Sequence, residues 1–301
     1  MSVRPRILPG VLAWLSLLSF TALAGDADRA ASPQPEVGVE GNAATYSGLI
    51  NREGVARLRR LLEAHPAVRE LRVDSSGGDP MAALDAGGLV RARGLAVVVD
   101  GRCNSACANY LFVPATRRVI RPGALVLWHN SCPQNIPADV KFSDVLAGRH
   151  PSISGQATPL GERNRGKTVE DLLDDPAELR RIDRRMRSYF GDWTKRHVAF
   201  FRDLPVDGRV VCLGDVLPLP LGPGQGYTLS VADMGAFGLC EVEAEPDYVA
   251  KVVETLAREA KSGLAHPVRL SDHPDFRPQP PAGACGPPAD AAGTTMETGP
   301  A

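Results

Sequence analysis

Between residues 44 and 128, short apolar runs alternate with longer segments in which apolar residues recur every three or four positions. The short runs are typical of buried strands, and the longer segments are typical of amphipathic helices. The strands we expect are Thr45–Ile50, Leu71–Val73, Leu95–Val99, Arg118–Ile120 and Leu125–Trp128. Strands that alternate with helices indicate an α/β fold with a parallel sheet covered by helices.

Two of the helices predicted in this region follow clear capping residues. Asn51 precedes a segment that carries Val55, Leu58, Leu61 and Leu62 on one face. Asp79 is followed by Pro80, which suits the first helical position because its missing N–H is not needed there. A third, short helix is predicted over Ser105–Val113.

The second half of the chain has a weaker pattern. We expect a long helix over Ala177–Phe201, a strand over Val210–Val216 and a short helix over Ser230–Phe237 with Ser230 as its cap. The arginines around the long helix are interpreted as a solvated face. Residues 148–168 are polar and aperiodic, which favours a mobile insertion.

The two ends of the chain are expected to lie outside the folded domain. Residues 1–24 read as a signal peptide, with Arg4 and Arg6 before an apolar run and a cleavage site after Ala24. This predicts a periplasmic or secreted protein without a stable membrane anchor after cleavage. Residues 25–43 are expected to be a flexible lead-in, residues 44–271 the domain, and residues 272–301, rich in Pro, Gly and Ala, a disordered tail.

The net charge and the cysteines limit the functions that this protein is expected to have. The 301 residues carry a net charge of −1 with no concentrated basic stripe, which argues against nucleic-acid binding. Cysteines of an exported protein are expected to form disulfides. Their spacing provides no set of metal ligands, and no metal or cofactor is expected. The six cysteines are Cys103, Cys107, Cys132, Cys212, Cys240 and Cys285.

Three motifs contain candidate catalytic residues. A Ser-Ser-Gly-Gly turn at 75–78 follows a strand, and glycines there let backbone N–H groups face an anion. Ser105, in Cys-Asn-Ser-Ala-Cys, lies at a helix start, where negative charge is favoured, although a serine at that position is more commonly a plain helix cap. His129 ends an apolar strand, where a histidine can act as a base but is more often structural.

In this order and spacing, the motifs between Leu71 and Asn130 resemble the Clp protease proteolytic subunit and the crotonase-like superfamily, including predicted exported Clp-like proteins. A weaker echo covers Leu229–Leu239. The resemblance implies a repeated β-β-α superhelix with a parallel central sheet flanked by helices. It also allows homo-oligomers.

The resemblance further implies a role for each matching residue. Ser105 matches the nucleophile and His129 the general base. The N–H groups of Ala106 and Gly77, with Gly78 as neighbour in the turn, match the oxyanion hole. The implied activity is that of an exported serine hydrolase, such as a peptidase, acting on a peptide or ester.

The family's orienting aspartate has no counterpart here. Its expected place falls on Gly226 or on the neighbouring residues 224 and 225. Asp215 is the substitute we expect, and Asp183, Asp192 and Asn130 are further options. A serine–lysine dyad ranks below the Ser–His pair, with Lys141, Lys167 and Lys195 as its candidates.

The cysteines suggest two further hypotheses. Cys103 and Cys107 are interpreted as lying one turn apart on a helix, which disfavours a bond between them. We therefore expect one of them to bond Cys132, tying the nucleophile helix to the strand that ends in His129. Cys212 with Cys240 is the second expected pair.

Two other functions compete with the hydrolase. A crotonase would bind an acyl-CoA thioester, which is not expected outside the cytoplasm. A non-catalytic descendant would use the same cleft for binding, and the missing acid favours it.

Overall fold

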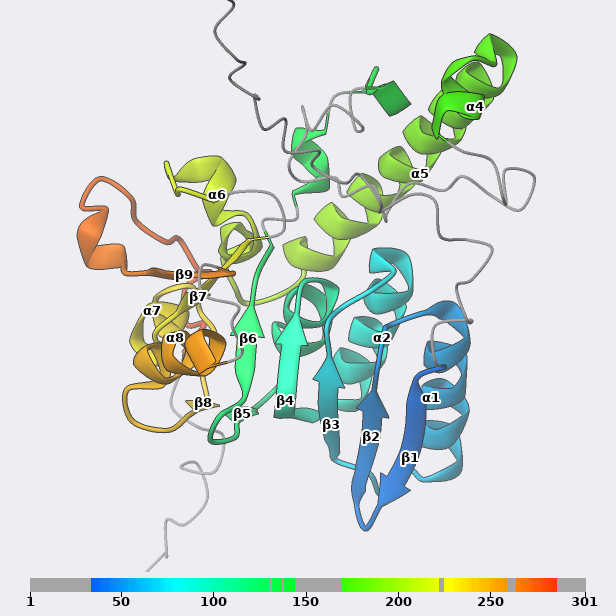
Figure 1. Cartoon of the computed structure of the whole chain (residues 1–301). Coiled ribbons are helices and arrows are strands. Elements are labelled where there is room, and N and C mark those ends of the chain that lie inside the picture. Colours follow the sequence, from blue (N-terminus) through cyan, green and yellow to red (C-terminus); the bar gives the residue numbers. More distant parts are fainter. Residues whose placement is uncertain are drawn as a thin grey trace, which may run out of the picture.

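The computed structural model describes residues 34–129, 132–136, 138–143, 169–221, 225–258 and 264–285. They form an α/β fold with a mostly parallel sheet and flanking helices, as predicted (Figure 1). The predicted signal peptide and the predicted insertion at 148–168 lie outside the described residues. Within the described ranges, no helix has both the length and the apolar character needed to cross a bilayer.

The main sheet runs in the order β1-β2-β3-β4-β5-β8, and β6 pairs with β4. Only the β1–β2 pair is antiparallel. β1 lies within the predicted lead-in and was not expected. The strands are β1 Glu36–Glu40, β2 Ala43–Ser47, β3 Glu70–Ser75, β4 Ala96–Asn104, β5 Arg118–Ile120, β6 Leu125–Leu127 and β8 Val242–Glu243.

Strand β4 is long enough to pair with two different strands along one edge. Its first half pairs with β5, with Val98 opposite Val119, and its last residues pair with β6, with Cys103 opposite Val126. Its other edge pairs with β3, where Ser75 lies opposite Cys103. The carboxyl ends of β3, β4 and β6 therefore meet at one edge of the sheet (Figure 1).

Helices α1 (Arg52–Ala64) and α2 (Pro80–Arg93) cover one face of the sheet behind β1–β4 (Figure 1). The predicted caps are confirmed. The Asn51 side chain accepts from Gly54 N, and the Asp79 side chain accepts from the N–H groups of Met81 and Ala82. Gly94 ends α2 in the left-handed conformation, φ +58°.

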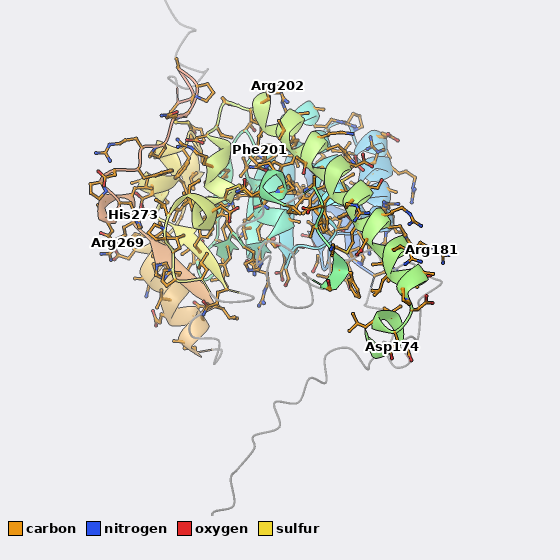
Figure 2. All side chains as sticks on the ribbon, turned by 90° about the horizontal axis from the view of Figure 1, so that it is seen from above. Asp174, Arg181, Phe201, Arg202, Arg269 and His273 are labelled. Carbon is orange, nitrogen blue, oxygen red and sulfur yellow. A yellow bond between two sulfur atoms is a disulfide. The ribbon has the colours of Figure 1, made fainter. Side chains whose placement is uncertain are left out.

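Helix α5 (Pro176–Arg202) follows the short α4 (Val169–Leu173) and crosses above the carboxyl ends of the strands (Figure 1). Figure 2, viewed from above, shows it extending from Arg181 to Arg202. Its buried face includes Trp193 and His197. Trp193 Nε1 donates to Tyr110 Oη at 2.8 Å, and the Tyr110 hydroxyl is also hydrogen-bonded to His197 Nδ1 at 2.9 Å. This buried chain ties α5 to the helix that follows Ser105.

The strand predicted at Val210–Val216 is wrong. The segment forms a 3-10 turn, η5 (Gly208–Val211), and a short helix, α6 (Leu213–Val216). Asp207 caps η5 by accepting from Arg209 N. The Tyr227 hydroxyl then accepts from Leu213 N and donates to Val210 O, so backbone groups that a strand would pair with a neighbouring strand are bonded to this side chain instead.

The remaining elements pack beside the main sheet. Strands β7 (Gly226–Leu229) and β9 (Ala265–Val268) form a two-stranded parallel sheet. Ser230 caps α7 (Val231–Ala236), as predicted. The other elements are η2 (Pro133–Asn135), α8 (Tyr248–Arg258) and η6 (Leu270–Asp272).

Residues 273–285 lie in the segment predicted as a disordered tail, yet they pack on the domain. Phe276 contacts Phe237, and the Arg209 guanidinium lies over the Phe276 ring. The N–H of Gln279 donates to Asp207 Oδ2 at 2.6 Å. The folded part of the chain therefore extends past residue 271.

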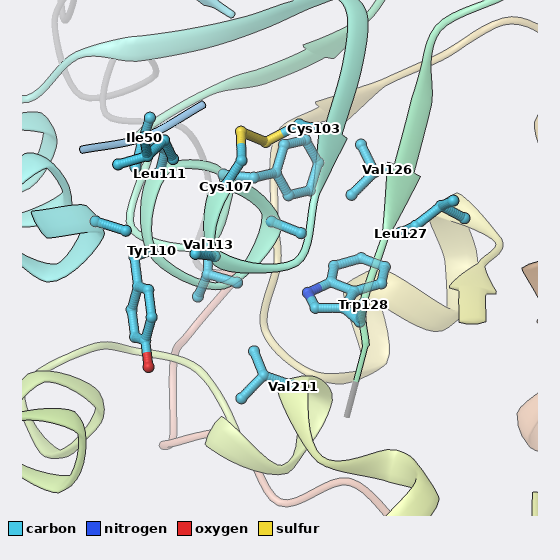
Figure 3. Close-up of a cluster of buried hydrophobic side chains, with 14 of the residues drawn as sticks. Ile50, Cys103, Cys107, Tyr110, Leu111, Val113, Val126, Leu127, Trp128 and Val211 are labelled. Atoms are coloured by element: carbon cyan, nitrogen blue, oxygen red, sulfur yellow. A yellow bond between two sulfur atoms is a disulfide. The ribbon is translucent and has the colours of Figure 1, made fainter. Parts of the chain in front are cut away.

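Both expected disulfide pairings are wrong. The bonds are Cys103–Cys107, Cys132–Cys212 and Cys240–Cys285. Cys103 and Cys107 do not share a helix: Cys103 is a strand residue of β4 and Cys107 lies in the helix beyond the turn. That change of direction brings their Cα atoms to 5.1 Å, within disulfide range. Figure 3 shows this bond in the core near Leu111 and Val126.

Candidate functional site

Ser105 occupies the turn between β4 and the following helix. Its φ is +54°, a left-handed conformation that is uncommon for a residue with a side chain. Its N–H donates to Leu127 O at 2.8 Å, and its carbonyl accepts from Asn109 N at 3.0 Å. The turn is thus joined to β6 on one side and begins a helix on the other. The helix continues through the π-helical turn η1 (Ala108–Phe112).

The far end of this helix is anchored by Arg118. Its buried guanidinium donates to Phe112 O at 3.0 Å and also to Val113 O. A third bond reaches Cys240 O at 2.6 Å. Burial lowers the pKa of Arg118 to about 10, so the group remains charged at neutral pH. A cation at the carboxyl end of a helix stabilises it.

The Gly-Gly turn lies against Ser105. A Cβ on Gly77 would come within 2.7 Å of Asn104 O, 2.8 Å of Ser105 Cβ and 3.1 Å of Ala106 N. Gly77 also has a φ of +97° and Gly78 a φ of +143°. Glycine is therefore required by both the space and the backbone. The structure brings together the Ser-Gly-Gly turn and the Ser105 turn, which the sequence places about 30 residues apart.

The N–H of Gly77 already has a partner. It donates to the oxygen of the buried Ser75 side chain at 3.1 Å. Ser75 belongs to the predicted turn, but no separate role was predicted for it. A hydroxyl two residues before a glycine is a common turn signal.

Gly78 presents its N–H differently. Ile50 N donates to Gly77 O, and Asp79 N donates to Ile50 O, so Gly78 is the bridged residue of a parallel pair. In that pattern the N–H of the bridged residue points away from its partner strand. Ile50 follows β2, so the Gly78 N–H points to the opposite side, where Ser105 and Ala106 follow β4. Gly78, rather than Gly77, therefore directs its N–H to the Ser105 side.

His129 lies two residues past the end of β6, whose last residue, Leu127, accepts from Ser105 N. The preceding residue, Trp128, forms an antiparallel bridge with Tyr227, with bonds of 2.9 and 2.8 Å. Burial lowers the pKa of the half-buried His129 ring below its usual value of 6.5. The imidazole is therefore neutral at pH 7, as a general base must be. Burial is the cause of this shift, and no carboxylate of the described residues contributes to it.

Gly226 packs directly on the His129 ring. A Cβ at 226 would lie 2.5 Å from His129 Cδ2, 3.1 Å from Nε2 and 2.7 Å from Trp128 O. The place where the resemblance expects an aspartate thus has no room for a side chain while the ring keeps this position. The sequence identified the position, but only the structure shows that the ring rests against its backbone.

Other contacts are seen for the predicted substitutes. Asp215 is exposed on α6 and accepts from Asn135 Nδ2 at 2.7 Å. Asp183 accepts from Phe142 N at 2.8 Å. Asp192, Lys141 and Lys195 are exposed, which does not fit a buried partner. Asn130 and Lys167 lie outside the described residues.

Within the described ranges, no group of three His, Cys, Asp or Glu side chains is placed to hold a metal ion.

No protein-family model matches this sequence, and no curated protein matches it. Solved structures that match include a mutant of ClpP1 from Listeria monocytogenes, 15% identical, covering 68% of this chain and 92% of that chain with a TM-score of 0.30. A membrane-bound stomatin-specific protease in complex with a substrate peptide is 14% identical, covering 70% and 78%, with a TM-score of 0.34. The enoyl-CoA hydratase from Bacillus halodurans is 11% identical, covering 55% and 84%, with a TM-score of 0.27. At these identities and TM-scores, the likeness concerns the fold alone.

Proposed function

We propose that this protein is a serine hydrolase in which Ser105 is the nucleophile and His129 the general base. The observation that carries the proposal is the Ser105 turn, held at positive φ against Gly77 and bonded through its N–H to Leu127 O, two residues before His129. A serine on a sharp strand-to-helix turn presents its hydroxyl away from the backbone, as nucleophile turns of hydrolases do.

The chemistry follows from these positions. The neutral His129 ring removes the proton of Ser105 as Oγ attacks a carbonyl carbon. The N–H groups of Ala106 and Gly78 receive the oxyanion, and donors of this type lower the barrier by several kcal/mol. His129 returns the proton to the leaving group, and water then hydrolyses the acyl-enzyme. A peptide or an ester fits this scheme.

Among the residues that the structure describes, no carboxylate contributes to the pKa shift of His129, so we expect a slower enzyme than one with a full triad. Removing the carboxylate's orienting effect in a serine protease reduces kcat by about four orders of magnitude. Here the backbone of β7, pressed against the ring through Gly226, restricts the orientation of His129 instead.

The competing function is a non-catalytic protein that binds ligands at the same turn. The contact between Gly226 and His129 favours it, since position 226, where the resemblance expects the third catalytic residue, has no room for a side chain.

A fluorophosphonate probe separates the two. We expect the probe to label the wild-type protein, with no labelling of Ser105→Ala and a rate about 100-fold lower for His129→Gln. Far-UV circular dichroism and melting curves would show that both variants are folded. If folded wild-type protein is not labelled within hours, the hydrolase proposal is rejected and the binding function is supported.

We also propose that the protein is exported. Three disulfides among the described residues support an oxidising compartment. Expression of the full chain in a bacterium, followed by fractionation and mass spectrometry, should yield a periplasmic or secreted protein that begins at Gly25. Recovery of uncleaved chain from the cytoplasm would contradict this.

A further inference from the structure

We propose that the Cys103–Cys107 disulfide is a positioning element for the nucleophile, holding Ser105 and the Ala106 N–H in place against the Gly-Gly turn. This inference rests on the proposed function and adds that full activity requires the intact Cys103–Cys107 bond. Ser105 lies midway between the two cysteines, and the bond closes the chain around it.

The two cysteines attach the turn to different parts of the core. Cys103 is fixed in the sheet, because it is paired with Ser75 of β3 on one side and with Val126 of β6 on the other. Cys107 lies in the helix after the turn, and both residues are fully buried. The bond therefore fixes the start of the helix relative to the strand that precedes it.

The turn between them needs such a restraint. A left-handed conformation is unfavourable for serine and persists only where its surroundings enforce it. The fit is also narrow: Ala106 N would lie only 3.1 Å from a Cβ on Gly77. A small rotation of the helix start would move the Ala106 N–H relative to the Gly78 N–H, and both must point at the same oxyanion.

The Cys103–Cys107 bond closes a short loop of chain, so we expect it to fix the local backbone geometry more than it raises the overall stability. Its cysteines are only 4 residues apart, whereas those of the other two bonds are 80 and 45 apart. Because the entropy removed from the unfolded chain grows with loop length, the two longer bonds should stabilise the fold more. The three bonds therefore serve as internal controls for one another.

The experiment compares three double variants by probe labelling, melting temperature and amide hydrogen exchange. They are Cys103→Ala/Cys107→Ala, Cys132→Ala/Cys212→Ala and Cys240→Ala/Cys285→Ala. We expect the first pair to reduce the labelling rate at least about tenfold, since small displacements of reacting groups reduce rates steeply. Its melting temperature should fall less than that of the second pair. The third pair should label at the wild-type rate.

Hydrogen exchange at Ser105 and Ala106 tests the restraint without requiring catalysis. We expect it to accelerate in the first variant only. If the wild-type protein is not labelled at all, the proposed function fails, and exchange alone decides whether the bond holds the turn. Unchanged exchange at these two amides, or loss of labelling that follows melting temperature equally in all three variants, would overturn the inference. If the alanine pair does not yield folded protein, Cys103→Val/Cys107→Ala, which retains more buried volume, replaces it.

Discussion

The contact between Gly226 and His129 yields the sharpest prediction, through the substitution Gly226→Ala. The added Cβ would lie 2.5 Å from His129 Cδ2, whereas carbon atoms pack at about 3.5–4.0 Å. The ring must therefore move by about 1 Å or more. The Trp128 carbonyl, at 2.7 Å from the same Cβ, is less able to yield, because it accepts a bond from Tyr227 N.

The expected effects can be scaled from these distances. Displacing a catalytic group by about 1 Å reduces rates by roughly 100-fold. Overpacking at a buried site destabilises a protein by about 1–3 kcal/mol. The fluorophosphonate labelling rate and the melting temperature measure the two effects separately. Because the φ of Gly226 is not in the left-handed region, the effect is steric rather than conformational.

Gly235→Ala is the matched control. Gly235 lies in α7, with nothing within 4 Å of an added Cβ. Alanine stabilises a helix interior relative to glycine by about 1 kcal/mol, so this variant should melt no lower than wild type and label normally. If Gly226→Ala also labelled at the wild-type rate and melted at the wild-type temperature, the placement of His129 against β7 would be refuted.

Three further predictions test the site and its surroundings. Gly77→Ala should abolish labelling and lower the unfolding free energy by about 1–3 kcal/mol, because the added Cβ would meet close neighbours and the φ of Gly77 is positive. Gly88→Ala is the control and should label normally, because there is open space around Gly88. Equal behaviour of the two variants would contradict this geometry. The labelling rate should rise with pH and level off with a midpoint below 6.5, since neutral His129 is the active form and burial lowers its pKa; a midpoint above 7 would exclude this. Burial lowers the pKa of His197 to about 4, so its contribution to stability is present above pH 6.5 and is lost as pH falls towards 4, by at most about 3 kcal/mol. Chemical denaturation at several pH values should show this slope, and His197→Gln should flatten it; an unchanged slope in that variant would assign the acid sensitivity to other groups.

Much of the fold could be predicted because local chemistry and tertiary packing agree. Helix α2 has a capping aspartate, a proline at its first position and a left-handed glycine after its end, and each is visible in the sequence. The 210–216 segment was mispredicted because its run of apolar residues is typical of a strand, and Val210, Val211 and Leu213 are indeed buried. The bonds that make it helical come partly from Tyr227, which is distant in sequence.

The site itself was only partly predictable. Order and spacing predicted Ser105 and His129 as a pair, and in the fold Ser105 N donates to Leu127 O, two residues before His129. The resemblance assigned the oxyanion N–H to Gly77, whereas the structure favours the Gly78 N–H, because the orientation of the turn depends on Ile50, which pairs with it from another strand. The disulfides failed for a related reason: whether Cys103 belongs to a strand or a helix cannot be decided from a four-residue spacing.

The disulfides have a consequence for how the chain acquires its structure. Numbered along the sequence, the first cysteine is bonded to the second, the third to the fourth and the fifth to the sixth. A chain that enters an oxidising compartment with its N-terminus first would present each partner as the next thiol to emerge. Pairing in order of arrival would then give the native set directly, without thiol–disulfide exchange to correct it. Oxidative maturation of this protein should therefore need an oxidant but no isomerase.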